Sequence, residues 1–148
     1  MAGRLIGAAA PAQRVQCPTD GATAITRGAL IYVDPTVVAG GVVRIATGAA
    51  EATTSPALFV ANATIAATAT SVLATLVTSD QLWEWDCAAD TAATQDLKRH
   101  NMSTSLLLDN TATDDATIRG VWTLLYRRGA AADRFAICKA NVVGAVTA

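Results

Sequence analysis

The stretch VWTLLYRRGAAADRFAICKANVV, residues 121–143, carries the clearest folding signal in the chain. Two runs rich in aromatic and aliphatic residues, 121–126 and 135–143, flank a polar segment that contains a glycine. This pattern is typical of a β-hairpin with a long connection. Because the connection contains Arg127, Arg128 and Arg134, the sequence predicts a hairpin with a basic tip.

Shorter runs of the same kind precede the hairpin. The segment 82–87, Leu-Trp-Glu-Trp-Asp-Cys, alternates in polarity as a strand with one buried face does, and we expect the face with Trp83 and Trp85 to pack inward. The stretch 93–100 is expected to form a turn or two of helix with Thr94 as its cap. Further strands bounded by Gly, Pro, Asn or Asp are expected at 28–34, 42–47, 57–61, 72–77 and 106–108.

This punctuation predicts an all-β, mainly antiparallel fold: a small β-barrel or sandwich-like single domain with at most one short helix. No internal repeat and no linker divides the chain, so one domain is expected to cover residues 1–148. Within it, an extended N-terminal arm is expected over about residues 1–12, and a frayed tail over residues 144–148.

Composition narrows the classes of function. Hydrophobic residues make up 52% of the chain and charged residues 16%, which excludes general disorder. The apolar excess reflects either a surface that meets a partner or only the many alanines. The net charge of −1 argues against a nucleic-acid partner. The uncharged stretch 52–79 is long enough to span a bilayer, but its Pro, Asn and Thr content leads us to expect no membrane partner.

The sequence predicts no catalytic site. Its only histidine, His100, lies in the basic cluster Lys98-Arg99-His100, which we expect to be exposed. A Cys–His enzyme would need that histidine beside a reactive thiol, but none of the cysteines has a recognisable nucleophile motif. We expect Cys17, Cys87 and Cys138 to be buried free thiols.

Acidic residues offer no clear ligand or acid–base site either. Glu84 and Asp86 could form a carboxylate pair, but we interpret them as the solvated face of a half-buried strand. Asp109, Asp114 and Asp115 could approach a calcium ion, yet their spacing lacks the alternating oxygen ligands of a dedicated loop. We therefore expect no metal and no cofactor.

Charge and aromatic residues instead suggest contact surfaces. Basic side chains gather at the hairpin tip while acids dominate 80–96, which fits either a solvated surface of mixed charge or a subunit that presents opposite charges to different neighbours. The tryptophans are expected in the core, although one could anchor an interface. The candidate contact residues are Arg127, Arg128, Arg134, Trp83 and Trp85.

Several segments of the second half match a known pattern. They are Ser79-Asp80-Gln81-Leu82-Trp83-Glu84-Trp85-Asp86, Asp96-Leu97-Lys98-Arg99-His100, Leu107-Leu108-Asp109-Asn110-Thr111, Gly120-Val121-Trp122, Gly129-Ala130-Ala131-Ala132-Asp133-Arg134 and Asn141-Val142-Val143. Together they resemble the head decoration (capsid cement) proteins of tailed bacteriophages. The first half is similar in layout only, so the resemblance covers about two-thirds of the chain. Trp85-Asp86-Cys87 departs from the pattern, which usually has a small or polar residue there.

The resemblance implies a β-rich structural protein that binds the outside of an icosahedral capsid and stabilises it by bridging capsomers. Its implied partners are the major capsid protein and itself, often as a homotrimer, and its implied location is the outer surface of a virion assembled in the host cytoplasm. No catalytic residues carry over, because that family has none. Two alternatives stay open: a tail or spike component that binds a host-surface glycan, and a Cys–His enzyme.

Overall fold

The computed structural model describes residues 3–34, 42–45, 57–111 and 121–141. These residues form eleven strands and two short 3₁₀ turns, η1 (Ala93–Gln95) and η2 (Ala131–Asp133). The predicted all-β, mainly antiparallel class with little helix is therefore confirmed. The strands are β1 (Arg4–Gly7), β2 (Arg14–Pro18), β3 (Leu30–Asp34), β4 (Val42–Ile45), β5 (Leu58–Ala61), β6 (Ser71–Leu76), β7 (Leu82–Cys87), β8 (Arg99–Met102), β9 (Leu107–Asp109), β10 (Trp122–Arg128) and β11 (Phe135–Ala140).

The C-terminal strands close into a small barrel. They pair in the order β7-β11-β10-β8-β9, and β9 pairs back onto β7, so that five strands form a ring. The β7–β9 pair is parallel and the other pairs of the ring are antiparallel. Its longest hairpin joins β10 to β11, with Trp122 opposite Ala140 and Arg128 opposite Phe135. The hairpin predicted at 121–143 is thus present, but its arginine pair belongs to the end of β10.

The strands β2 to β6 form a second sheet in the order β2-β6-β5-β3-β4, and all its pairs are antiparallel. The strands expected at 28–34, 42–47, 57–61 and 72–77 correspond to β3, β4, β5 and β6. They do not follow each other as a simple meander. Because β3 pairs with both β4 and β5, it lies between them.

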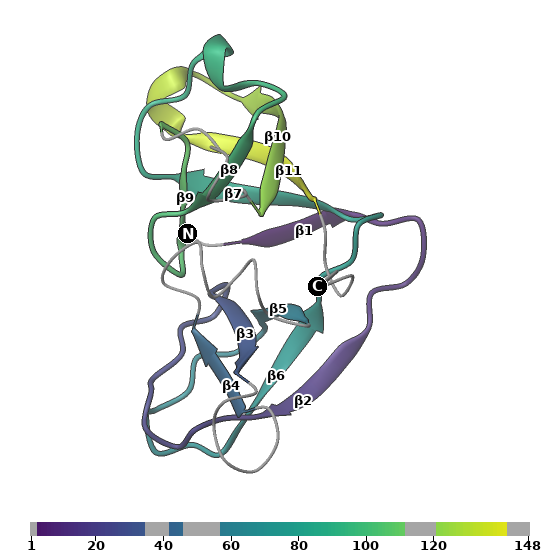
Figure 1. Cartoon of the computed structure of the whole chain (residues 1–148), viewed down its shortest axis with the longest axis vertical. Coiled ribbons are helices and arrows are strands. Elements are labelled where there is room, and N and C mark those ends of the chain that lie inside the picture. The colour runs from purple at the N-terminus through teal and green to yellow at the C-terminus, as the bar shows by residue number, and fades with distance from the viewer. Residues whose placement is uncertain (1–2, 35–41, 46–56, 112–120, 142–148) are drawn as a thin grey trace.

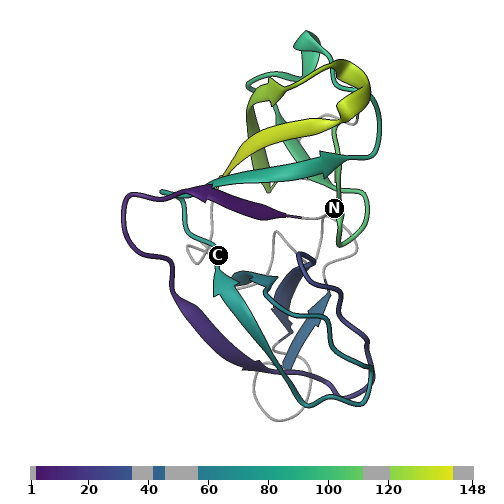
Figure 2. The same cartoon turned by 180° about the vertical axis from the view of Figure 1, so that it is seen from behind.

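The first strand joins the two halves of the molecule. β1 pairs with β7, with Arg4 opposite Glu84 and Leu5 opposite Trp83, and so it belongs to the sheet of the barrel. The chain then builds the second sheet and returns to the barrel at β7. Figures 1 and 2 show β1 between the barrel and the second sheet from both sides. The segment expected as an N-terminal arm therefore includes a paired strand.

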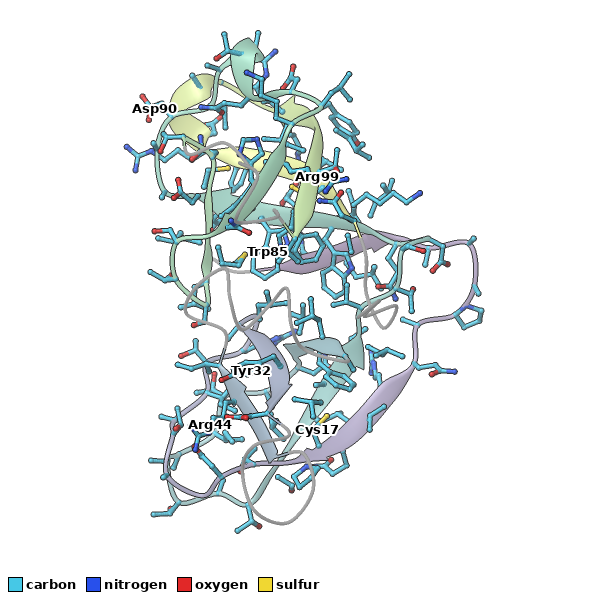
Figure 3. All side chains as sticks on the ribbon, viewed as in Figure 1. Cys17, Tyr32, Arg44, Trp85, Asp90 and Arg99 are labelled. Atoms are coloured by element: carbon cyan, nitrogen blue, oxygen red, sulfur yellow. The ribbon has the colours of Figure 1, made fainter. Side chains whose placement is uncertain are left out.

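One core cluster reaches across both sheets. Its centre is three fully buried tryptophans: the ring centroid of Trp122 lies 5.3 Å from that of Trp85 and 6.5 Å from that of Trp83. Leu30 and Leu58 of the second sheet belong to the same cluster. Figure 3 shows Trp85 at the end of the barrel that faces the second sheet, which explains how the two halves share this core. A smaller cluster, which includes Cys17 and Phe59, lies within the second sheet.

The prediction of a helix at 93–100 is wrong, apart from one 3₁₀ turn. The 3₁₀ turn η1 ends at Gln95, and its N-cap position is Ala92 rather than Thr94. Leu97 then adopts a left-handed backbone with a φ of 60°, which no helix continues through. The backbone N–H of Leu97 donates to the carbonyl of Leu124 at 2.7 Å, so pairing with β10 replaces helical bonding here. The tail expected to fray, 144–148, lies outside the described residues.

Candidate contact sites

The three arginines predicted at the hairpin tip are each bound to an acid of the same subunit. The Nε atom of Arg127 lies 3.0 Å from Oδ1 of Asp96, and that of Arg134 lies 2.8 Å from Oδ1 of Asp90. Arg128 pairs with Glu84. About a third to a half of each arginine side chain stays exposed, so a role in contacts between proteins stays a prediction. Their charges are, however, already matched within the fold.

The two tryptophans predicted as contact candidates are not on the surface. Trp83 is 2% exposed and Trp85 is fully buried. The indole N–H of Trp83 donates to Oε1 of Gln81 at 3.0 Å, which satisfies its polar atom inside the protein. The inward face of 82–87 is thus as expected, but neither ring can anchor a partner of the folded subunit. Burial in the shared core is the physical reason.

Glu84 corrects the interpretation of 82–87 as a strand with a solvated acidic face. It points away from the tryptophans, yet it is only 4% exposed. Its Oε1 accepts from Arg4 of β1 and its Oε2 accepts from Arg128 of β10. Two arginines therefore cover a carboxylate that the alternation alone would leave in solvent. With one arginine bound to each oxygen, this carboxylate links β7 to β1 and to β10.

His100 also corrects a prediction, because it is 1% exposed rather than part of an exposed basic cluster. It lies on β8, opposite Trp122, and strand alternation turns it inward while Arg99 stays exposed. Its Nε2 lies 3.0 Å from the carbonyl oxygen of Gln95. A sequence signal was available: Arg99-His100-Asn101-Met102 has Met102 two residues after the histidine, on the same face of a strand.

The three cysteines are free and buried, as predicted. Burial raises the pKa of Cys17, and it raises the pKa of Cys87 to about 12, with the charge of Asp86 as the smaller cause. Burial, followed by the neighbouring Cys87, raises the pKa of Cys138 well above its ordinary value. A thiolate is the nucleophilic form of cysteine, so these environments keep the thiols unreactive at neutral pH.

A buried hydrogen-bond network around Asn110 holds loops of the barrel together, and the sequence did not predict it. Asn110 is fully buried, and its Nδ2 donates to the carbonyls of Ala89 and Asp90 and to Oε1 of Gln95, at 3.0–3.2 Å. Its Oδ1 accepts from the N–H of Ala89. The Asn110 amide thus hydrogen-bonds to carbonyl groups of the loop after β7, which gives Asn110 a structural role. The signal Asp109-Asn110-Thr111 indicated a turn, but not a buried one.

The calcium candidate is only partly within the described residues. Asp109 is half-buried, while Asp114 and Asp115 lie outside the described ranges. In the residues that the structure describes, no group of three His, Cys, Asp or Glu side chains is placed to hold a metal ion. Over the same residues, no helix has the length and apolar character needed to cross a membrane.

A cleft of about 650 Å³ opens between the barrel and the second sheet. We call it the central cleft. Three arginines from three separate segments among the first 27 residues line it, and its described lining contains no acidic residue. The described lining residues are Gly3, Arg4, Leu5, Ala12, Arg14, Arg27, Gly28, Val60, Ala61, Asn62, Thr75 and Trp83. Sequence reasoning missed this site because its arginines are isolated in the chain and meet only through the packing of β1.

The fold and these sites define a class: an all-β protein in which a closed five-strand barrel and a second sheet enclose a positively charged cleft. Comparisons with family models, curated proteins and solved structures find no match. A functional assignment therefore has to start from the sequence segments quoted above and from the geometry of the sites.

Proposed function

We propose that this chain is a structural virion protein that binds the outer surface of an icosahedral capsid of a tailed bacteriophage. It stabilises the shell by bridging capsomers, with the major capsid protein as its partner. It acts by binding alone, with no chemical step, and without cofactor or metal.

The observation that carries the proposal is where the resembling segments lie. Residues 79–86 lead into and form most of β7, 107–111 contain β9, and 129–134 form the connection from β10 to β11. Residues 96–100 pair with β10. Segments spread over residues 79–134 of the sequence thus come together in one closed barrel. A resemblance that covers a complete folding unit supports common architecture better than scattered short matches would.

The exposed apolar side chains support assembly. Among the described residues, five large apolar side chains are substantially exposed: Ile6, Val15, Leu73, Leu97 and Tyr126. They lie on both the barrel and the second sheet, so the subunit can make small apolar contacts with more than one neighbour. Repeated weak contacts of this kind give strong attachment when many copies bind one shell. We propose that the neighbours include further copies of this chain, in a homotrimer.

The glycan-binding alternative is less well supported. Such a site would use an exposed aromatic face with Asp and Asn nearby, but all three tryptophans are buried. Among the described residues, Tyr126 is the aromatic side chain with the largest exposure, at 50%. We therefore keep capsid binding as the proposed function.

Co-expression with a candidate major capsid protein of a tailed bacteriophage tests the proposal. The labelled protein should sediment with assembled shells at a constant ratio to capsid subunits, and unlabelled protein should displace it. The same protein unfolded in urea, then diluted and added at once, is the control for nonspecific adhesion. If folded protein stays at the top of the gradient while shells sediment, the proposed function is wrong.

A further inference from the structure

The central cleft has features of a binding site that the proposed function does not yet use. Its walls come from β1, the start of β2, the loop before β3, and strands β5, β6 and β7. Its volume of about 650 Å³ lies within the usual range of ligand pockets. Its lining combines the half-buried apolar residues Leu5 and Ala12 with three arginines, while Val60 and Trp83 at its base are each only 2% exposed.

The described lining of the cleft carries positive charge. Arg4 is matched by Glu84, which lies behind it on β7. Within the described ranges, neither Arg14 nor Arg27 forms an ion pair, and both are exposed. Two guanidinium groups are thus available at the cleft, each with planar, bidentate donors that suit a carboxylate.

The walls of the cleft are held by hydrogen bonds that do not depend on a ligand. The N–H of Gly3 donates to the carbonyl of Gly28 at 3.0 Å, and the N–H of Gly28 donates to the carbonyl of Ala61 at 2.8 Å. On the facing wall, the side chains of Asn62 and Thr75 bond to each other at 3.0–3.1 Å. The Gly3–Gly28 and Gly28–Ala61 bonds tie the segment before β1 to the second sheet before anything binds, which lowers the entropic cost of binding.

We propose that the central cleft binds an acidic segment of a partner protein. Carboxylates of the segment pair with Arg14 and Arg27, and its apolar side chains lie on Leu5 and Ala12. The mixed lining favours a segment with both kinds of side chain over a small anion, which would leave the apolar part of the cleft unused. The identity of the partner as the capsid protein rests on the proposed function, whereas the binding itself does not.

Fluorescence anisotropy with short labelled peptides tests the cleft directly. The probes are a peptide of alternating Asp and Val, the same peptide with Lys in place of Asp, and citrate as a small competing polyanion. We expect the Asp–Val peptide to bind and the Lys–Val peptide not to bind. Raising the salt from about 0.05 to about 0.5 M should weaken binding of the Asp–Val peptide, because exposed charges are screened.

Charge reversal locates the binding. The double variant Arg14→Glu/Arg27→Glu should bind the Asp–Val peptide with an affinity lower by about tenfold or more, which corresponds to a loss of about 1.4 kcal/mol or more in binding free energy. The matched control Lys98→Glu/Lys139→Glu makes the same change in net charge at exposed positions of the barrel and should leave affinity within about twofold. If the double variant fails to fold, Arg14→Gln/Arg27→Gln replaces it, with the same direction of change expected.

Three results would overturn the proposal. They are equal binding of the Asp–Val and Lys–Val peptides, equal loss of peptide affinity in the cleft and control variants, and competition by citrate with an affinity as high as that of the peptide.

Co-sedimentation with capsid shells then separates the cleft proposal from the proposed function. If the Asp–Val peptide binds at the cleft but the protein does not sediment with shells, the proposed function fails and the cleft site stands. If the cleft variant sediments like wild type, the capsid contact lies elsewhere and the proposed function stands.

Discussion

At the scale of single residues, Glu84 shows most clearly how this fold uses charge. A carboxylate with 4% exposure needs partners, and Arg4 and Arg128 supply them from β1 and β10, which lie on either side of β7 in the sheet. Arg128 therefore has a folding role in addition to any role in contacts. Charge reversal at Arg128 would bring a second carboxylate against Glu84, so it tests folding as much as attachment.

We expect Glu84→Gln to lower the free energy of unfolding by about 1–2 kcal/mol. The substitution keeps the shape of the side chain but leaves two arginines without their counter-charge, and the exposure of both guanidinium groups limits the loss. Urea unfolding followed by tryptophan fluorescence measures it. Asp90→Asn is the matched control, because its pair with Arg134 is about half exposed on both sides. Equal losses in the two variants would contradict a special role for Glu84.

Substitution of Gly3 tests how closely the backbone at residue 3 packs against Trp85 of the shared core. A Cβ at this position would lie 2.5–2.9 Å from three ring atoms of Trp85, which is buried and cannot move aside. We expect Gly3→Ala to cost about 1–3 kcal/mol of stability. At Gly7 on the same segment the nearest atom, Cδ1 of Leu82, would be 3.9 Å away, so Gly7→Ala should be neutral or slightly stabilising. Thermal unfolding distinguishes them, and a neutral Gly3→Ala would show that residue 3 does not pack there.

The buried thiols predict how stability changes in alkali. The pKa of Cys87 rises from its ordinary value of 9.0 to about 12 in the folded state. Between about pH 9 and about pH 12 the Cys87 thiol therefore loses its proton in the unfolded chain but keeps it in the folded chain. The contribution of this thiol to the free energy of unfolding is complete below about pH 9 and is lost as pH rises toward about 12. Urea midpoints at about pH 8 and about pH 10.5 should differ less in Cys87→Ala than in wild type. An identical pH dependence in both proteins would contradict this assignment.

At the scale of elements, the connection from β6 to β7 holds the second sheet to the barrel. Gln81 in this connection is 2% exposed. Its Oε1 accepts from the N–H of Thr78 at 2.8 Å and from the indole of Trp83 at 3.0 Å, while its Nε2 donates to the carbonyl of Leu76 at 3.0 Å. One side chain thus fixes the end of β6 and the start of β7.

We expect Gln81→Leu to destabilise the protein by about 2–3 kcal/mol, because it leaves buried donors and an acceptor unpaired. Gln16→Leu is the control: the side chain of Gln16 donates to the hydroxyl of Ser71 on an exposed face, and the loss of stability should stay within about 0.5 kcal/mol. Chemical denaturation of both variants gives the comparison. Should Gln81→Leu prove as stable as the control, the connection does not depend on this side chain.

Elements with local signals could be predicted and those that depend on distant partners could not. The strands over 82–87 and 121–140 follow alternation and turn residues, which are properties of neighbouring positions. The burial of Glu84 depends on β1, which lies about 80 residues earlier in the chain, and no local pattern shows that pairing. The central cleft could not be predicted for the same reason: Arg4, Arg14 and Arg27 come together only after both sheets have formed.

At the scale of the whole molecule, the two sheets and their shared core make a subunit with several separate surfaces. The barrel presents ion-paired arginines, both sheets carry exposed apolar side chains, and the central cleft presents unmatched positive charge. A protein that bridges neighbours needs distinct surfaces for distinct contacts. This arrangement suits the proposed attachment to a repeated lattice.

The thermal stability of capsid shells with and without this protein tests the central claim most directly. A protein that binds only the assembled shell stabilises it by about 2.7 kcal/mol per site at a free concentration a hundred times its Kd. We therefore predict that saturating shells with the protein raises the temperature at which they release packaged DNA, and that the shift grows with occupancy. Shells that release DNA at the same temperature with and without bound protein would contradict the account.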